Sequence, residues 1–140
     1  MRGLEVIPEN PSLLHALALL RVRQGRLDAA LPLLGRAAVL APENARFAYV
    51  YAVALHSDGQ TKQSLAVLDE ALQRNPGNLD LLFARASFAA QDGDTAAARR
   101  FAERFVQLAP NDPRAKALLP LTRGHHAACD GRKIAKLYSY

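Results

Sequence analysis

The chain has 140 residues, of which half are hydrophobic, and it carries a formal net charge of +5. This length suits a single domain, and the hydrophobic content excludes a chain that is disordered throughout. Aliphatic residues dominate and alanine is abundant, whereas valine, isoleucine and aromatic residues are comparatively sparse, so the composition favours an all-α fold.

Prolines and glycines recur along the chain with a period of 34 residues. The prolines are Pro8, Pro42, Pro76 and Pro110, and the glycines are Gly25, Gly59 and Gly93, each 17 residues before a proline. A fixed period of this length is typical of repeat arrays, in which each unit buries its apolar face against its neighbours. We therefore predict an all-α solenoid with whole units at 11–44, 45–78 and 79–112.

Residues 1–10, MRGLEVIPEN, have the pattern of the end of a helix. Within them LEVIPEN matches AVLAPEN at 38–44 and VQLAPND at 106–112 in register. We expect residues 1–10 to be the end of a preceding repeat helix, and the chain to be a piece, or a shortened member, of a larger repeat protein.

The first whole unit is predicted to hold a helix from about Ser12 to Gln24, a turn at Gly25, and a second helix from about Asp28 to Leu40. Pro32 falls near the first turn of the second helix, where a missing amide hydrogen costs less than in the interior, so we expect that helix to persist. Residues with the i, i+3, i+4 spacing of a buried helix face are Leu14, Leu17, Ala18, Ala30, Leu34 and Ala37.

The second unit repeats this plan with Ala48, Tyr51, Ala52, Ser64, Leu68 and Ala71 at the same positions. Gly59 separates its two helices, where a glycine in the left-handed conformation would close the first helix. Thr61 is the predicted N-cap of the second helix.

The third unit keeps Gly93 and Pro110 but departs from the side-chain pattern. Arg85 stands where the other units have Leu17 and Tyr51. Large and small residues also trade places, with Phe105 at the position of Ala37 and Ala71, and Ala102 at the position of Leu34 and Leu68. We interpret this as a local swap that conserves volume, with a functional pocket as the alternative.

Residues 113–122 are predicted to form a capping helix opened by Asp112 and Pro113, with Pro120 expected to stop or kink it. Residues 123–140 form a basic C-terminal tail with a local charge of +3. Its His125, His126 and Cys129 could supply two or three metal ligands, but a structural site needs four, so no metal site is predicted. The tail could also dock on an apolar surface or on a neighbouring molecule.

The repeated pattern resembles the tetratricopeptide repeat over about residues 8–112. The residues that carry the resemblance are Leu14, Leu17, Ala18, Gly25, Ala30, Leu34, Ala37 and Pro42 in unit one, with Ala48, Tyr51, Ala52, Gly59, Ser64, Leu68, Ala71 and Pro76 in unit two. The resemblance implies a right-handed superhelix of antiparallel helix pairs, whose concave face is lined by the first helix of each pair. It also implies a non-catalytic scaffold that binds a protein or peptide partner.

The family register implies a peptide-binding groove lined by side chains of all three units. These are Ser12, His15, Leu19, Val22 and Arg23, then Arg46, Tyr49, Val53 and His56, then Asp80, Phe83, Ser87 and Gln91. We expect Tyr49 and Phe83, one repeat apart, to stand side by side as an exposed hydrophobic platform, unless loops or the tail cover them. Arg23 and Arg46 nearby would favour a ligand with an acidic group beside its apolar anchors.

Family members that grip the C-terminal carboxylate of a chaperone use Lys and Asn on the first unit, Asn on the second, and Lys and Arg on the third. Here the matching positions hold His15 and Leu19, Val50, and Asp80 and Ala84. None matches, so the resemblance does not extend to that clamp.

No P-loop, GxGxxG, GxSxG or HExxH pattern occurs, so we predict neither catalysis nor a cofactor. The segment Tyr49–Gln60 also resembles repeat regions that follow multihaem cytochrome domains in some large bacterial proteins, but no CxxCH motif is present. The apolar run Leu13–Leu20 is too short to span a bilayer. Cys129 is the single cysteine and cannot form an internal disulfide, so cysteine usage does not distinguish the bacterial cytoplasm from the periplasm. We expect a soluble protein in one of these two compartments.

Nucleic acid is not a favoured partner, because the basic excess sits mostly in the tail and not along the repeats. The runner-up function is an RNA-binding array like the pentatricopeptide repeats, which read one base per unit. The glycine and proline positions favour the peptide-binding family instead. Self-association through the solenoid ends or the tail, and metal binding through the tail, are the remaining alternatives.

Overall fold

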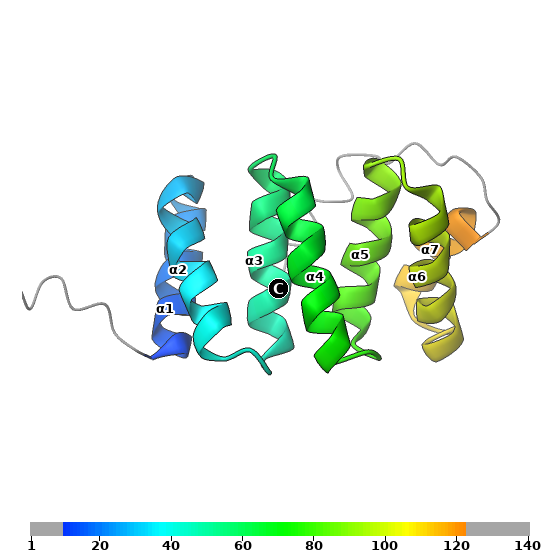
Figure 1. The fold of residues 1–140 in the computed structure, drawn as a ribbon, viewed down its shortest axis with the longest axis horizontal. Helices are drawn as coiled ribbons and strands as arrows, with labels where there is room; N and C mark the ends of the chain where they lie inside the picture. Colours follow the sequence, from blue (N-terminus) through cyan, green and yellow to red (C-terminus); the bar gives the residue numbers. More distant parts are fainter. Residues whose placement is uncertain (1–9, 123–140) are drawn as a thin grey trace, which may run out of the picture.

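The computed structural model describes residues 10–122, which form seven α-helices and no strand (Figure 1). The helices are α1 (Pro11–Arg23), α2 (Leu27–Leu40), α3 (Ala45–Ser57), α4 (Thr61–Arg74), α5 (Leu79–Gln91), α6 (Thr95–Leu108) and α7 (Pro113–Thr122). The first six form three helix pairs that stand in a row, and α7 follows at the end of the row (Figure 1). The predicted all-α solenoid is confirmed. The N-terminal segment and the basic tail, with His125, His126 and Cys129, lie outside the described residues.

Within each pair the two helices are joined by a tight turn that contains a glycine. Gly59 has a φ of +85°, and Gly25 and Gly93 adopt the same left-handed conformation. The amide of Gln60 donates to the carbonyl of Leu55 at 2.9 Å, which closes the last turn of α3. The predicted glycine turns are confirmed, but Thr61 is the first residue of α4 and Gln60 is its N-cap.

Between pairs, an asparagine two residues after the repeated proline starts the next first helix. The side chain of Asn10 accepts a hydrogen bond from the amide of Leu13 at 3.2 Å, that of Asn44 from Phe47 at 3.2 Å, and that of Asn78 from Leu81 at 3.0 Å. Each bond satisfies an amide that the helix itself leaves free. Every unit therefore begins with the same cap, which the sequence analysis did not identify.

Small residues allow the two helices of a pair to approach closely. Ala52 of α3 and Ser64 of α4 are fully buried, and the Ser64 hydroxyl donates to the Ala52 carbonyl at 2.6 Å. Ala18 with Ala30, and Ala86 with Ala98, hold the equivalent positions and are buried as well. A larger residue here would separate the helices, so these positions determine the spacing within each pair.

Two prolines lie inside helices. Pro32 is part of α2, which persists as predicted, whereas Pro120 does not stop α7. That helix continues two residues further to Thr122, whose hydroxyl donates to the carbonyl of Leu119 at 2.7 Å. The capping helix therefore does not stop at Pro120, and its bounds agree with the predicted 113–122.

The first helices of the pairs lie on the inner side of the row. α3 contacts α5, and α5 contacts α7, directly across successive units. A hollow of about 380 Å³ lies between the second helices α2 and α4, with Ala48 and Tyr51 of α3 among its lining. We call the side formed by α1, α3 and α5 the inner face, and the side formed by α2, α4 and α6 the outer face.

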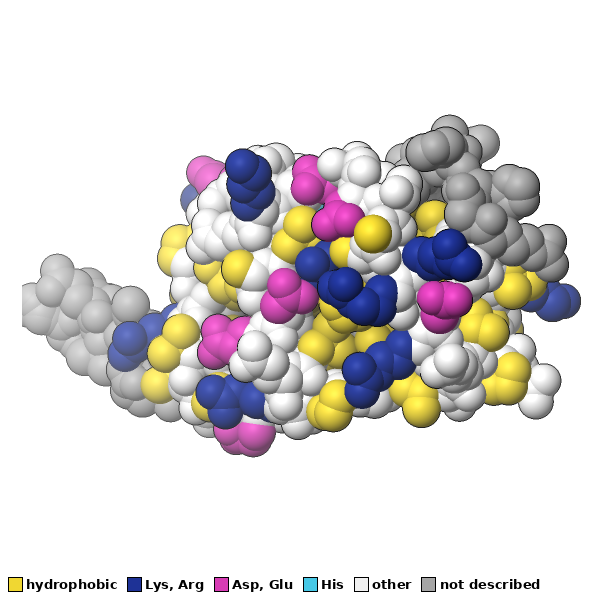
Figure 2. Space-filling model, turned by 45° about the vertical axis from the view of Figure 1, so that its right-hand side comes forward, with side chains coloured by type: hydrophobic (Ala, Val, Ile, Leu, Met, Phe, Trp, Pro, Cys, Tyr) yellow, Lys and Arg dark blue, Asp and Glu magenta, His cyan; other side chains and the backbone are white. Residues whose placement is uncertain are grey.

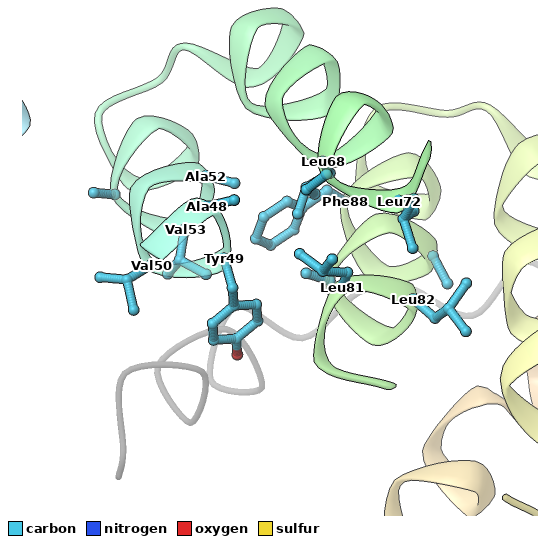
Figure 3. Packing of buried hydrophobic residues seen from close by; sticks show 14 of the residues in the cluster. Ala48, Tyr49, Val50, Ala52, Val53, Leu68, Leu72, Leu81, Leu82 and Phe88 are labelled. Carbon is cyan, nitrogen blue, oxygen red and sulfur yellow. The ribbon is translucent and has the colours of Figure 1, made fainter. Parts of the chain in front are cut away.

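One continuous core joins the units along the row. Phe88 of α5 is fully buried and lies beside Ala52 and Leu68 of the preceding pair (Figure 3). Phe105 and Ala102 are both fully buried in α6, so the exchanged large and small residues of unit three fill the interior as a packing swap. Burial of such side chains contributes about 1.5–3 kcal/mol each to folding.

Candidate functional site

The side chains predicted to line the groove all belong to α1, α3 or α5, but they differ widely in exposure. His15, Tyr49 and Val53 are buried; Leu19, Val22, His56, Phe83 and Ser87 are half-buried; Arg23 and Arg46 are exposed. The inner face therefore offers partly covered apolar groups with arginines at the α1 and α3 end, instead of an open aromatic platform.

Tyr49 is buried, contrary to the sequence-based expectation. Only 4% of its surface is exposed, and it belongs to the core cluster, against which Phe83 packs from the next unit. In Figure 3 its ring extends from α3 away from Leu68 and Phe88. The expectation that Tyr49 forms an exposed platform with Phe83 is wrong, because the register gives the helix face of a residue but not how deeply its neighbours cover it.

Phe83 takes part in a contact that links α5, α6 and α7. Its ring lies 6.2 Å from that of Phe105 in a tilted arrangement, and the guanidinium of Arg114 lies 5.8 Å from its centroid. Arg114 also donates to Asp80 at 2.7 Å and to Asp112 at 3.1 Å. The hydrogen bond from Arg114 lowers the pKa of Asp112, and the same bond raises the pKa of Arg114. Phe83 is thus held in place by the capping helix.

His56 bridges two units on the inner face. Its Nε2 lies 3.0 Å from the Gln91 side-chain oxygen of α5, and its Nδ1 lies 3.4 Å from the Thr61 hydroxyl. Its ring stacks on Phe88 at 3.9 Å, nearly parallel. Because both ring nitrogens and the ring face are engaged within the fold, His56 acts first as a link between α3 and α5.

His15 stacks on Phe47 at 4.5 Å, and neither of its ring nitrogens has a hydrogen-bond partner in the described part of the chain. Burial, and secondarily the positive charge of Arg46, lower the pKa of His15 below its ordinary value of 6.5. The neutral imidazole is therefore the form that the fold accommodates.

The α1 end of the inner face remains the most open part of the predicted groove. Leu19 and Val22 pack against the core from the inner side and keep part of their surface free. Arg23 follows at the last turn of α1, exposed, and makes no ion pair among residues 10–122. An apolar surface beside an unpaired guanidinium suits a segment that carries an apolar side chain next to an acidic one.

Arg85 of α5 lies between α4 and α6 and makes an ion pair that the sequence analysis did not identify. Its Nε lies 2.6 Å from Asp69 Oδ1 of α4, and its guanidinium lies 4.8 Å from the Phe101 ring of α6. Arg100 approaches the same ring at 5.0 Å. In the view of Figure 2, basic and acidic side chains stand close together with apolar patches between them.

No helix within residues 10–122 is long and apolar enough to cross a membrane. The same residues contain no group of three or more histidines, cysteines or carboxylates that could hold a metal ion.

The sequence matches two models of the tetratricopeptide repeat, one over residues 15–78 and the other over residues 55–119. No protein with curated annotation matches it significantly. Together the two matches extend from α1 to α7 and include all three helix pairs.

Solved structures with the same fold include several tetratricopeptide repeat proteins. One from Parabacteroides merdae is 23% identical with a TM-score of 0.75, and the match covers 81% of this chain and 44% of that one. The chaperone SycD from Yersinia enterocolitica, solved with a peptide of the translocator YopD, is 17% identical with a TM-score of 0.69, covering 96% and 93%. The first tetratricopeptide repeat domain of Spaghetti, bound to an HSP90 peptide, is 18% identical with a TM-score of 0.72, covering 99% and 100%.

This chain spans less than half the length of the Parabacteroides protein. The matched models, the 34-residue glycine and proline period and the row of helix pairs agree with one another. The chain belongs to the tetratricopeptide repeat family.

Proposed function

We propose that this chain is a non-catalytic interaction scaffold that binds a peptide or protein segment on the inner face of α1, α3 and α5. The observation that carries the proposal is the α1 end of this face, where half-buried Leu19 and Val22 adjoin exposed Arg23. The fitting ligand is an extended or helical segment with one or two apolar anchors and a nearby carboxylate.

Two solved relatives support this assignment. SycD was solved with a YopD peptide, and the Spaghetti domain with the HSP90 peptide SRMEEVD. The carboxylate clamp of chaperone-binding members is not expected here, because the matching positions hold His15, Leu19 and Asp80 among others. Asp80 is also paired with Arg114 and would repel an acidic terminus. The ligand's acidic group is therefore assigned to Arg23 at the other end of the face.

The proposal is tested by selecting peptides on the intact chain from a displayed random library and titrating the best one by calorimetry. Leu19→Ser combined with Arg23→Glu should weaken binding by at least tenfold, or about 1.4 kcal/mol. The matched control is Leu108→Ser combined with Arg104→Glu, which changes a leucine and an arginine four residues apart on α6 of the outer face. Thermal melting confirms that each variant is folded.

Equal loss of affinity in both variants, or loss only in the control, would place the ligand away from the inner face. The RNA-binding alternative is tested with the same proteins and homopolymer RNA. Binding of RNA that weakens steeply with added salt, together with no selected peptide, would favour that alternative.

A further inference from the structure

The hollow of about 380 Å³ on the outer face, between α2 and α4, has no part in the proposed function. Alanine, valine and proline side chains make up most of its lining. Leu19, Val22 and Arg23 of the inner face are not among the lining residues, so the hollow is a separate feature. Mostly apolar hollows of this volume with a few polar groups are typical of ligand sites.

The hollow has space because several of its lining side chains are small. One period later in the chain, larger residues stand at four of the lining positions: Asp69, Leu72, Leu82 and Phe101 take the places of Gly35, Ala38, Ala48 and Val67. Leu72 and Leu82 are at most 8% exposed, and Phe101 packs against the same core. The later unit thus places leucine and phenylalanine side chains where the earlier unit leaves space.

The edge of the hollow is apolar on the α2 side and charged on the α4 side. Val39 of α2 is 73% exposed, so the apolar surface continues beyond the hollow itself. On α4, Glu70 and Arg74 lie 3.9 Å apart, with side chains 71% and 50% exposed. An exposed ion pair of this length contributes little to stability, so a partner can compete for the Glu70 carboxylate.

These features favour a protein segment over a free small molecule. A small molecule would occupy the hollow alone, whereas Val39 and Glu70 at its two edges are contacted together only by a larger surface. The anchor side chain should be leucine or phenylalanine, because these residues occupy the equivalent positions in the later unit. A basic neighbour complements Glu70, which is the more exposed member of the ion pair at the edge.

We propose that the hollow between α2 and α4 is a second docking site, at which a partner protein inserts one leucine or phenylalanine and pairs a neighbouring lysine or arginine with Glu70. An occupant of the outer face leaves the inner face free, so the chain can hold two partners at once.

The test uses displayed peptides with a fixed central phenylalanine or leucine and random flanking positions. They are selected on the intact chain carrying Leu19→Ser and Arg23→Glu, so the result does not depend on the inner-face site. Enriched peptides should carry lysine or arginine within one helical turn of the anchor. Calorimetry then gives the affinity of the best peptide for this chain and for each variant made in it.

Filling the hollow should remove the site. The filled variant, Ala38→Leu combined with Val67→Phe, copies the later unit and should bind the best peptide at least about tenfold more weakly. Ala66→Leu is the matched control, because Ala66 is exposed on α4 and is not part of the lining, and it should leave the affinity unchanged. Thermal melting confirms that both variants are folded.

The charge assignment is tested separately, by variants that change only exposed side chains and so keep the fold. Glu70→Lys should weaken binding of the same peptide about fivefold, and replacing the basic residue of the peptide with glutamate should restore part of this loss. Glu103→Lys makes the same charge change on α6, where Glu103 lies 3.9 Å from Arg99, and should have little effect.

Equal affinity for the filled and parent chains, failure to enrich any peptide, or an acidic residue beside the anchor would each overturn the proposal. N-acetylphenylalanine amide, followed by NMR, serves as a small-molecule probe of the same hollow. Binding of this probe that the filled variant abolishes, without any enriched peptide, would assign the hollow to a small molecule and also overturn the docking site.

Discussion

Arg85 and Asp69 form an ion pair, with Nε 2.6 Å from Oδ1, at the two positions that hold Tyr51 and Gly35 one unit earlier. In the earlier unit a Cβ atom on Gly35 would lie only 3.1 Å from the Tyr51 ring. The contact between α2 and α3 is thus made by the Tyr51 ring against the side-chain-free Gly35. The equivalent contact between α4 and α5 is made by the ion pair of Asp69 and Arg85. Each departure from the repeat pattern is explained by the other.

This pairing predicts strong coupling between the two positions. Asp69→Ala should destabilise the fold by about 1–3 kcal/mol, because it leaves the nearly buried Arg85 without its carboxylate. The double change Asp69→Gly with Arg85→Tyr copies the earlier unit and should cost less than the sum of its two single changes. Chemical denaturation of the four proteins measures the coupling free energy, and additive costs would show that the two contacts are not interchangeable.

Overpacking of the second pair is expected when Ala71 is enlarged. Ala71 is 4% exposed, so Ala71→Phe should cost about 1–3 kcal/mol of folding free energy. Ala66→Phe on the exposed side of the same helix is the control and should have little effect. Thermal melting distinguishes them; an unchanged midpoint for Ala71→Phe would mean that the interior can take up a ring at this position.

Replacing a turn glycine should destabilise the fold because of the backbone conformation alone. Gly59 has a φ of +85°, yet a Cβ atom there would meet no atom within 4 Å. Gly59→Ala should therefore destabilise by about 1 kcal/mol through left-handed strain, without any clash. Gly77, which has no such φ and only an ordinary contact with Leu108, should accept alanine at lower cost. Similar melting temperatures for the two variants would contradict this interpretation.

The helix pairs and their turns could be predicted from sequence because their causes are local. A left-handed Gly59 and a small residue at Ala52 or Ser64 leave periodic signals that one chain repeats three times. The exposure of the site could not be predicted in the same way. Tyr49 is only 4% exposed and belongs to a core cluster that extends through all three helix pairs, and a helical register does not specify how deeply a residue is covered.

The ion pairs between units were missed although a signal for them exists. Asp80 and Arg114 stand one period apart with opposite charges and lie 2.7 Å from each other. Arg85 departs from Leu17 and Tyr51 at its position, Asp69 stands where the preceding unit has Gly35, and the two form an ion pair. A comparison of register positions between neighbouring units, instead of within each unit, would have identified both pairs.

Stability should depend on pH through His15. The fold holds this ring against Phe47 with neither nitrogen hydrogen-bonded within residues 10–122, and burial followed by Arg46 lowers its pKa below 6.5. The unfolded chain therefore binds a proton more readily than the folded one. The free energy of unfolding should be greatest above about pH 6.5 and should fall as the pH drops toward the lowered pKa of the folded state.

His15→Phe isolates this effect, because a ring of similar shape can still stack on Phe47 but cannot be protonated. Denaturant unfolding of both proteins at pH values between about 7.5 and 5 gives a difference in unfolding free energy at each pH. Groups other than His15 are the same in both proteins, so their contributions cancel in the difference. The wild type should lose stability relative to His15→Phe as the pH falls. A difference that stays constant would mean that His15 is protonated equally well in the folded and unfolded chains, and that its burial carries no electrostatic cost.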